Sequence, residues 1–317
     1  MKTAIYGVWH VHAPEYTNAA LRYGEVVGFY EPNDELAEEF IKAFNLHRFA
    51  SAEELLSSDA EGVIVCSATS SHAEDIVKIA RSKKHVFTEK VLALTDEDCA
   101  KIEEAVNENG VKFVISLFQK YLPARRAIKE VCDSGELGNI NYLRFRNCHS
   151  GSIYDWLPPH FYNREQCGGG AMIDLGAHGM YLTHWILGEP IAASSAFTVC
   201  NQNPGAAKKN VDMVEDNAVT VMTFKNGAIA VNETGFVSCC SPVVFEAHGD
   251  KGYVTIENGN VIKCSQATEG KRVEVELGQP LPLPIDQFLS GNILPGCGME
   301  EARALTRMME MAYRSVQ

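Results

Sequence analysis

The sequence has few of the features that mark a membrane or nucleic-acid-binding protein. No apolar run approaches the about 20 residues of a membrane span, and the N-terminus carries no signal-peptide pattern. The net charge is −13, from 28 basic and 41 acidic side chains, without a long run of either sign. Because nucleic acids and anionic membranes are bound by basic patches, we expect neither as a partner. The missing span and signal pattern predict a cytoplasmic protein.

The cysteines show no metal-binding or disulfide pattern. There are ten of them, none in a C-x-x-C motif, and Cys239 and Cys240 are adjacent. Such irregular spacing argues against a zinc ribbon or a disulfide framework. We expect most of the cysteines to be small buried hydrophobes in a reducing compartment.

The first 118 or so residues have the pattern of a doubly wound α/β domain. Short apolar segments alternate with amphipathic ones, which is typical of a parallel sheet covered by helices on both faces. Ligands of such sheets bind at the carboxyl ends of the strands. The expected strands are 2–7, 25–30, 62–66, 85–88 and 112–116, and the expected helices are 13–23, 34–44, 52–56, 72–82 and 96–109.

The remainder, residues 119–317, has a different rhythm, and the length of 317 residues suits two domains. A helix over 124–134 and a strand over 140–148 are followed by several strands between 194 and 266. Asn-Gly turns between these strands favour antiparallel hairpins. We expect a mobile loop at 202–209 and a closing helix over 300–314.

The turn after the first strand is a weak dinucleotide fingerprint. Gly7 supplies the tight turn, but Trp9 and His12 stand where the fingerprint has glycine. Glu31 follows about 20 residues later, where an acidic group binds the adenine ribose. No Arg or Lys directly follows it, and its charge repels a 2′-phosphate, which favours NAD over NADP. Trp9 either displaces the pyrophosphate slightly or stacks on a cofactor ring.

His10 and His12 form an H-x-H pair, which suggests metal ligands. Without a third ligand nearby in sequence, such a pair is more often not a metal site. We therefore expect no metal.

The segment from Gly168 to His178 carries the strongest chemical signal. A glycine run leads into an expected first helical turn, with Asp174 and His178 four residues apart on one face. A carboxylate beside an imidazole can transfer protons. The alternative is that Asp174 is a helix N-cap and His178 is unrelated to it.

Lys90 lies just past the carboxyl end of the expected strand 85–88. A lysine there can donate to a substrate oxygen that gains negative charge. The alternative is an ordinary solvated side chain.

Several motifs together resemble the glucose–fructose oxidoreductase / inositol dehydrogenase / MocA (Gfo/Idh/MocA) family. They are the strand–turn–helix at Gly7 and the segments 70–73 (SSHA), 88–90 (TEK), 134–138 (SGELG), 169–178 (GGAMIDLGAH) and 284–288 (PIDQF). The resemblance covers nearly the whole chain. It implies a Rossmann-like dinucleotide-binding domain over 1–118 and an α/β domain with an open, mostly antiparallel sheet over 119–317, for substrate binding and oligomerisation as a homodimer or homotetramer.

The resemblance also implies an NAD(P)-dependent dehydrogenase or reductase acting on a hydroxyl or carbonyl of a sugar, polyol or related compound. Lys90, Asp174 and His178 match the family's catalytic motif. His178 would exchange the hydroxyl proton, Asp174 would orient and charge it, and Lys90 would stabilise the oxyanion or lower the pKa of His178. The nicotinamide carries the hydride. Many members have an Asp three residues after the histidine, and this sequence has Tyr181 at that position.

Further residues are expected around the ligands. For His72 the alternatives to cofactor contact are helix capping and solvent exposure. The expected cofactor-binding residues are Gly7, Trp9, His10, Val11, Glu31, Ser67, Thr69, His72, Glu89 and Lys90. The expected substrate-binding residues are Lys90, Gln119, Tyr121, Trp156, Asp174, His178 and Tyr181.

Two other functions are compatible with the same scaffold. One is a redox-neutral lyase or epimerase that uses tightly held NAD. The other is a non-catalytic regulator that senses a sugar or nucleotide. The presence of Lys90, Asp174 and His178 together argues against a sensor, which has no need of a proton relay.

Overall fold

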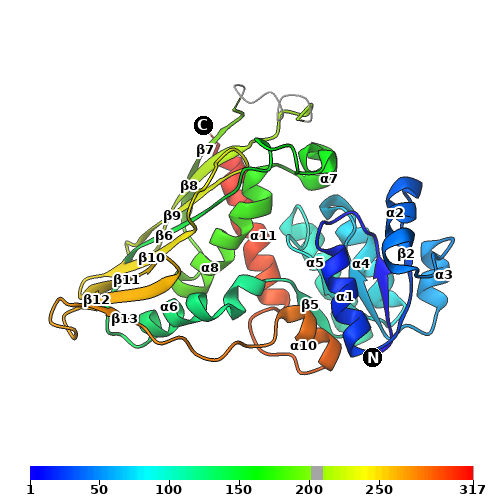
Figure 1. The fold of residues 1–317 in the computed structure, drawn as a ribbon, viewed down its shortest axis with the longest axis horizontal. Helices are drawn as coiled ribbons and strands as arrows, with labels where there is room; N and C mark the ends of the chain where they lie inside the picture. The colour runs from blue at the N-terminus through cyan, green and yellow to red at the C-terminus, as the bar shows by residue number, and fades with distance from the viewer. Residues whose placement is uncertain (201–209, 317) are drawn as a thin grey trace. The chain divides into compact units, whose positions relative to one another are not determined.

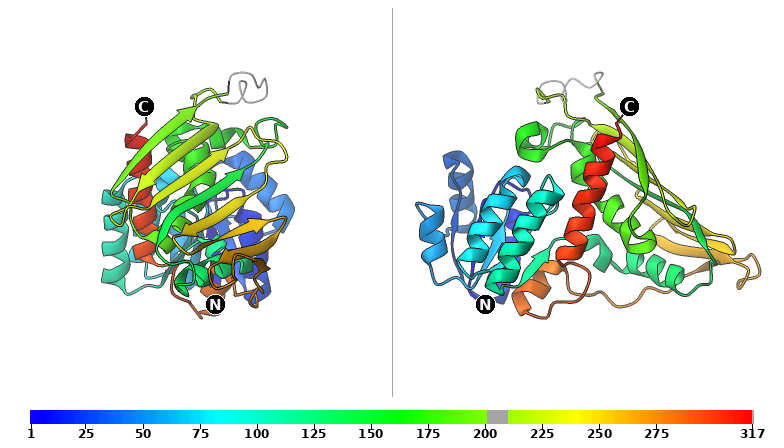
Figure 2. Two further views of the ribbon diagram at one scale, coloured as in Figure 1. Left: turned by 90° about the vertical axis from the view of Figure 1, so that its left-hand side faces the viewer. Right: turned by 180° about the vertical axis from the view of Figure 1, so that it is seen from behind.

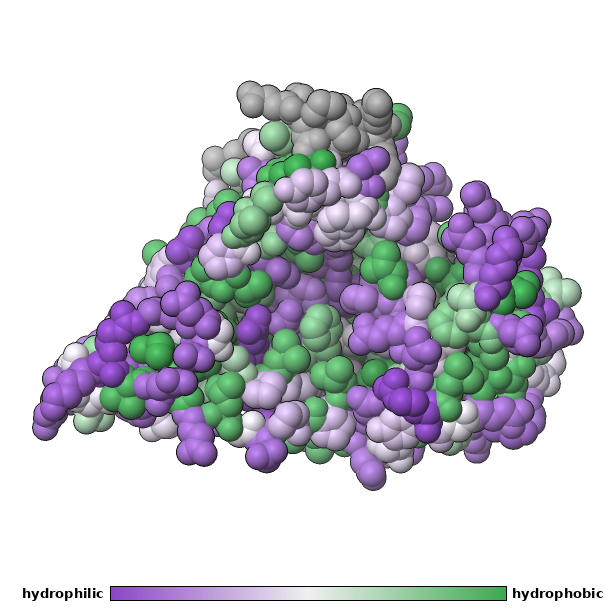
Figure 3. All heavy atoms as spheres, viewed as in Figure 1, coloured by the Kyte–Doolittle hydropathy of each residue, from purple (hydrophilic) through white to green (hydrophobic). Residues whose placement is uncertain are grey.

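The computed structural model describes residues 1–200 and 210–316. The loop expected at 202–209 therefore lies outside the described residues. The chain forms two compact units, one of Met1–Leu117 with Pro282–Thr306 and one of Phe118–Leu281 with Arg307–Gln317. Among the described helices, none combines the length and apolar composition that crossing a bilayer requires. Hydrophilic and hydrophobic residues are interspersed over the face drawn in Figure 3.

The first unit contains a five-stranded parallel sheet in the order β2-β1-β3-β4-β5, as expected for a doubly wound domain. The strand order reverses between β1 and β3, and ligands bind at such a switch point. Figures 1 and 2 show α1 on one face of the sheet and α4 and α5 on the other. The strands are β1 Thr3–Tyr6, β2 Val26–Tyr30, β3 Gly62–Val65, β4 His85–Thr88 and β5 Phe113–Ile115; the helices are α1 Ala13–Tyr23, α2 Asp34–Phe44, α3 Ala52–Ser57, α4 His72–Arg81 and α5 Asp96–Asn109.

The sequence accounts for the ends of these helices. Asn33, Ser51 and Thr95 precede α2, α3 and α5, and each side chain accepts a hydrogen bond from a backbone N–H of the first turn. Such N-caps satisfy N–H groups that have no partner inside the helix. At the other end, Gly110 closes α5 in the left-handed conformation.

The segment 282–306 belongs to the first unit, whereas the expected domain division assigned it to the second. The cause is apolar packing by α10 (Pro284–Ser290), whose Phe288 is buried and lies 5.8 Å, between ring centroids, from Phe87 of β4. A backbone bond from Ile115 to the carbonyl of Cys297 joins the same segment to β5.

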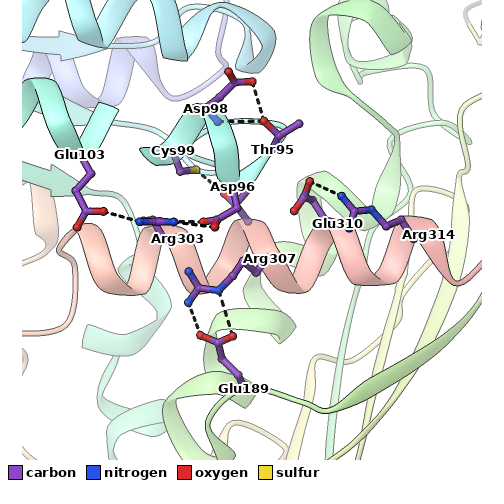
Figure 4. A network of polar contacts seen from close by, with 11 residues as sticks. Thr95, Asp96, Asp98, Cys99, Glu103, Glu189, Arg303, Arg307, Glu310 and Arg314 are labelled. Atoms are coloured by element: carbon purple, nitrogen blue, oxygen red, sulfur yellow. Dashed lines mark hydrogen bonds and ion pairs between the residues drawn. The ribbon is translucent and has the colours of Figure 1, made fainter. Parts of the chain in front are cut away.

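The closing helix α11 (Met299–Arg314) contributes residues to both units. Within the first unit, Arg303 forms ion pairs with Asp96 and Glu103 (Figure 4). Within the second, Arg307 pairs with Glu189.

The second unit is an eight-stranded sheet in the order β13-β12-β11-β10-β6-β9-β8-β7. All neighbours are antiparallel except β6 and β9. The Asn-Gly turns at 226–227 and 258–259 connect hairpins, as expected. The elements are α6 Pro123–Asp133, β6 Ile140–Cys148, α7 Arg164–Cys167, α8 Ala177–Leu187, β7 Ala192–Thr198, β8 Asn217–Thr223, β9 Ile229–Gly235, β10 Val244–Gly249, β11 Gly252–Glu257, β12 Asn260–Ser265 and β13 Arg272–Glu274.

One face of this sheet is covered by α6 and α8, and no described helix covers the other, which we call the open face (Figures 1 and 2). The alternation along β8 follows from this arrangement, because its residues are exposed and buried in strict turn.

Candidate functional site

The turn after β1 lies at the switch point of the parallel sheet. Gly7 has a φ of +76°, and a Cβ added there would lie 2.6 Å from the backbone of Ser67, which follows β3. Only glycine tolerates both that backbone conformation and that approach. The expected role of Gly7 in the tight turn therefore has a clear physical basis.

Glu31 is buried at the end of β2 and holds this turn. Its carboxylate accepts hydrogen bonds from the backbone N–H of Val8 (2.8 Å) and of Asn33 (2.9 Å). Burial raises the pKa of Glu31, while these two bonds act to lower it. A carboxylate offers about four lone-pair sites, so each oxygen keeps acceptor capacity beyond these two bonds.

Arg48 is a cation that sequence reasoning missed beside Glu31. Its Nη2 donates to the carbonyl of Glu31 (2.7 Å) and to the carboxylate of Asp34 (2.8 Å). The backbone of Arg48 pairs with that of Phe29, within β2, in an isolated parallel bridge. This pairing brings the Arg48 side chain to Glu31. No short-range motif signals such a contact.

His10, His12 and Glu89 come together where β1 and β4 end. The Glu89 carboxylate is buried, lies 2.8 Å from Nδ1 of His12 and accepts bonds from Tyr16 and the backbone N–H of Lys90. Burial opposes a charge on His12 and on Glu89. The Glu89 carboxylate nevertheless raises the pKa of His12, and His10 and His12 help to hold the pKa of Glu89 well below its usual range.

Glu89 is also the third side chain that an H-x-H metal site requires, since one possible ligand atom from each of the three residues lies within 4.8 Å of the others. Sequence distance hid this juxtaposition. The expectation of no metal remains a prediction, and the observed contacts are those of a hydrogen-bonded ion pair.

Lys90 follows Glu89 directly and is buried, which excludes the alternative of a solvated lysine. The peptide bond from Lys90 to Val91 is cis. His72 lies beneath this loop, and its ring nitrogens are 3.0 Å from the carbonyl oxygen of Val91 and 3.1 Å from that of Ser67. His72 is 1 % exposed, so it is not solvent-exposed, and its side chain does not cap α4, whose N-cap residue is Ser71. His72 joins the loops that follow β3 and β4.

The glycine run in the second unit is held by Glu215. This buried carboxylate accepts the backbone N–H of Gly170 (2.9 Å) and of Met172 (3.1 Å), together with the hydroxyl of Tyr313. A Cβ on Gly170 would lie 2.0 Å from the carbonyl oxygen of Glu215, and one on Gly169 would lie 1.9 Å from the Tyr313 hydroxyl. The glycines therefore permit a close approach of chain segments.

The expected α-helical turn at Asp174 is a π-helical turn, Met172–Gly176, followed by α8. The regular α-helical first turn expected there is therefore wrong, while the shared face of Asp174 and His178 remains a prediction. The N-cap alternative is also wrong, because neither the π-turn nor α8 has a side-chain cap. Burial lowers the pKa of His149, and the negative charge of the Asp174 carboxylate acts to raise it.

His178 is buried on the first turn of α8 and is held by Tyr181. Its Nδ1 lies 2.9 Å from the Tyr181 hydroxyl, which also accepts the backbone N–H of Gln119 (3.2 Å). The Gln119 side chain in turn accepts a bond from Nε of Arg125 (3.1 Å). Burial lowers the pKa of Arg125. His178, Tyr181 and Gln119, all predicted to bind substrate, thus share one hydrogen-bond network. Arg125 also belongs to this network and was not predicted from the sequence.

The other expected site residues differ in accessibility. Trp156 is exposed and its ring lies 4.6 Å from that of His149. Tyr121 and Thr69 are buried, whereas Val11 is exposed and Trp9 is half-buried. Ser67 donates its hydroxyl to Asp75 (2.7 Å).

A parallel sheet with a glycine turn and a buried carboxylate at its switch point is typical of nucleotide-dependent enzymes, oxidoreductases among them. The comparisons agree: the model of the oxidoreductase family with an NAD-binding Rossmann fold matches residues 1–117, and the Gfo/Idh/MocA C-terminal domain matches residues 125–255. The chain belongs to the Gfo/Idh/MocA family of NAD(P)-dependent dehydrogenases and reductases.

Curated relatives are distant. The chain is 28% identical over 173 residues to the uncharacterised oxidoreductase YrbE of Bacillus subtilis, covering 55% of this chain and 48% of that protein. It is 28% identical to 1,5-anhydro-D-fructose reductase of Ensifer adhaerens, covering 76% and 71%. For myo-inositol 2-dehydrogenase of Thermotoga maritima the identity is 28%, over 54% and 48%. The match thus spans about half the length of two of these relatives.

Solved structures share the fold over the whole chain. Levoglucosan dehydrogenase in complex with NADH superposes with a TM-score of 0.82 at 18% identity, covering 99% of this chain and 96% of that one. Aldose–aldose oxidoreductase from Caulobacter crescentus, complexed with glycerol, gives 0.81 at 18% identity, covering 99% and 97%.

Proposed function

We propose that this protein transfers a hydride between a nicotinamide cofactor and a hydroxyl or carbonyl group of a sugar, polyol or related small molecule. The observation that carries the proposal is the buried His178, held by Tyr181 directly after the Glu215-anchored glycine run. The relatives support the substrate class, because those with named activities include an anhydrofructose reductase and an inositol dehydrogenase.

The residues after β1, β2 and β3 fit a dinucleotide. Gly7 allows the turn, and Glu31 has acceptor sites left for the adenine ribose. The backbone of residues 8–11, with Ser67, Thr69, His72 and Glu89, would line the rest of the binding site. We propose NAD rather than NADP, because the buried Glu31 carboxylate repels a 2′-phosphate, while Arg48 is already bonded to Asp34.

The bound nicotinamide supplies the hydride acceptor or donor. His178 exchanges a proton with the substrate oxygen, and burial of its ring excludes bulk water from that transfer. Asp174 supplies negative charge from the π-turn just before α8, and π-turns are frequent at functional sites. To Lys90 we assign the stabilisation of charge on the substrate oxygen.

The proposal includes a homodimer or homotetramer. The open face of the second sheet exposes Val219, Val221 and Ile229, which supports assembly through that face.

The direct test is a screen of polyols and sugars with NAD and NADP, read as NADH or NADPH absorbance, with Lys90→Met and His178→Asn measured in parallel. We expect net cofactor reduction with at least one polyol. Each variant should lower kcat by about 10²–10⁴-fold, the usual contribution of a positioned proton-transfer group, while dinucleotide affinity by calorimetry stays near that of the unaltered chain. Dinucleotide binding without net reduction or oxidation would contradict the proposal, and full turnover in Lys90→Met would remove Lys90 from it.

A further inference from the structure

Two adjacent thiols are presented on the surface of the second unit. Cys239 and Cys240 lie in the connection between β9 and β10, and both side chains are exposed. Their sulfur atoms are 3.4 Å apart. Cys240 has a φ of +53°, a left-handed conformation that is uncommon for a residue with a side chain.

The surrounding contacts fix this connection. The backbone N–H of Ser238 donates to the carbonyl of His149 (3.0 Å), and Arg146 donates to the hydroxyl of Ser241 (2.6 Å). The Tyr154 hydroxyl lies 3.2 Å from Sγ of Cys239. The backbone is therefore anchored on both sides of the pair, which reduces the conformational entropy lost when a ligand binds to the two sulfurs.

The two thiols differ in acidity. Hydrogen bonds from Tyr154 and Cys240 lower the pKa of Cys239, while the pKa of Cys240 is raised by the same contact with Cys239. The thiolate is the form that binds metals and attacks electrophiles. The two shifts favour the thiolate at Cys239 over the thiolate at Cys240.

A disulfide is not the favoured product of this pair. Neighbouring Cα atoms are about 3.8 Å apart across a trans peptide, below the usual range of about 4.4–6.8 Å for a disulfide. A bond between the two sulfurs would be strained and easily reduced. A single atom that bridges both sulfurs avoids that strain, because the sulfurs stay apart.

We propose that Cys239 and Cys240 form a dithiol site for a soft, thiophilic centre of the trivalent-arsenic class. With a monosubstituted arsenic(III) oxide, two S–H bonds break, two As–S bonds form and the oxide oxygen leaves as water, so that no atom changes oxidation state. Soft thiolate ligands select such centres over hard cations.

The test uses phenylarsine oxide with the full-length, pre-reduced chain. We expect one equivalent per chain by intact mass spectrometry, released by 2,3-dimercaptopropanol and retained against an equal concentration of a monothiol. Cys239→Ser and Cys240→Ser should each weaken binding by about 10²–10⁴-fold, the gain that a second linked attachment provides.

Cys264→Ser is the matched control, because Cys264 is a single half-buried thiol bonded to the carbonyl of Gly270, and it should bind as the unaltered chain does. Equal circular dichroism spectra would show that the variants are folded. The proposal is overturned if the unaltered chain binds no arsenical, or if either serine variant binds it as tightly as the control. Recovery of a stable Cys239–Cys240 disulfide in a glutathione buffer would likewise contradict the strain argument.

Discussion

At the scale of single residues, Tyr181 sets the chemistry open to His178. The hydroxyl oxygen accepts the N–H of Gln119, so its own hydrogen is available to Nδ1 of His178. A neutral imidazole that accepts at Nδ1 carries its proton on Nε2. We therefore expect neutral His178 to present Nε2–H as a hydrogen-bond donor to a carbonyl oxygen, and proton transfer to that oxygen requires the imidazolium form.

The variant Tyr181→Phe tests this role because it removes the hydroxyl and keeps the ring. We expect kcat to fall by about 10-fold to 100-fold, toward the lower end of general acid–base effects, with KM little changed and the pH–rate profile altered. The control is Tyr162→Phe, which also loses a buried hydroxyl contact, to Ser152 rather than to His178. If the pH–rate profile of Tyr181→Phe is unchanged and both variants lose kcat equally, Tyr181 has only a structural role.

Glu31 carries the proposed preference for NAD. In Glu31→Gln the amide keeps the size but loses the negative charge and one acceptor oxygen. NAD affinity should therefore fall by about 5-fold to 30-fold, the cost of about 1–2 kcal/mol in hydrogen bonding. NADP affinity should stay level or rise. Fluorescence titration with both cofactors measures this, and Glu35→Gln on the exposed surface of α2 is the control. Tighter binding of NADP than NAD by the unaltered chain would show that the ribose assignment is wrong.

At the scale of elements, the glycine run and the π-turn depend on chain segments far away in sequence. Replacing Gly170 by Ala places a Cβ 2.0 Å from the Glu215 carbonyl oxygen. Overpacking of this kind typically costs about 1–3 kcal/mol, so the free energy of unfolding in urea should fall by that amount. Gly278→Ala is the control, because a Cβ there lies 3.9 Å from its nearest neighbour. An equal, small effect of both changes would show that Glu215 can move aside.

Local patterns were sufficient for most elements and insufficient for the site. The limits of α2, β4, α5 and β6 follow from caps and periodicity, and the structure confirms them. The π-turn could not be predicted, because its bonding depends on Glu215 and Tyr313, which lie 40 or more residues away in sequence. Separation along the chain, by 77 residues for Glu89 and His12 and by 17 for Arg48 and Glu31, also hid these two contacts.

At the scale of the whole molecule, the two units are interleaved along the chain. Phe288 lies near the C-terminus, yet its ring packs in the first unit beside Phe87 and Gly62. Phe288→Ala should therefore destabilise the first unit by about 3–5 kcal/mol, the cost of deleting a buried Phe ring. Hydrogen exchange followed by mass spectrometry should show faster exchange in β4 and β5 than in β8 and β9. The exposed Leu294→Ala is the control; uniform exchange in all four strands would contradict the assignment.

The return of residues 282–306 to the first unit also has a consequence for biosynthesis. When the first 117 residues have left the ribosome, the sheet they form still lacks the cover of α10 and the ion pairs of Arg303. At about 5–20 residues per second, the nascent domain waits on the order of tens of seconds for that cover. During this interval its apolar surface is open to chaperones, and a truncated message would release a product that has a Rossmann topology but an incomplete core.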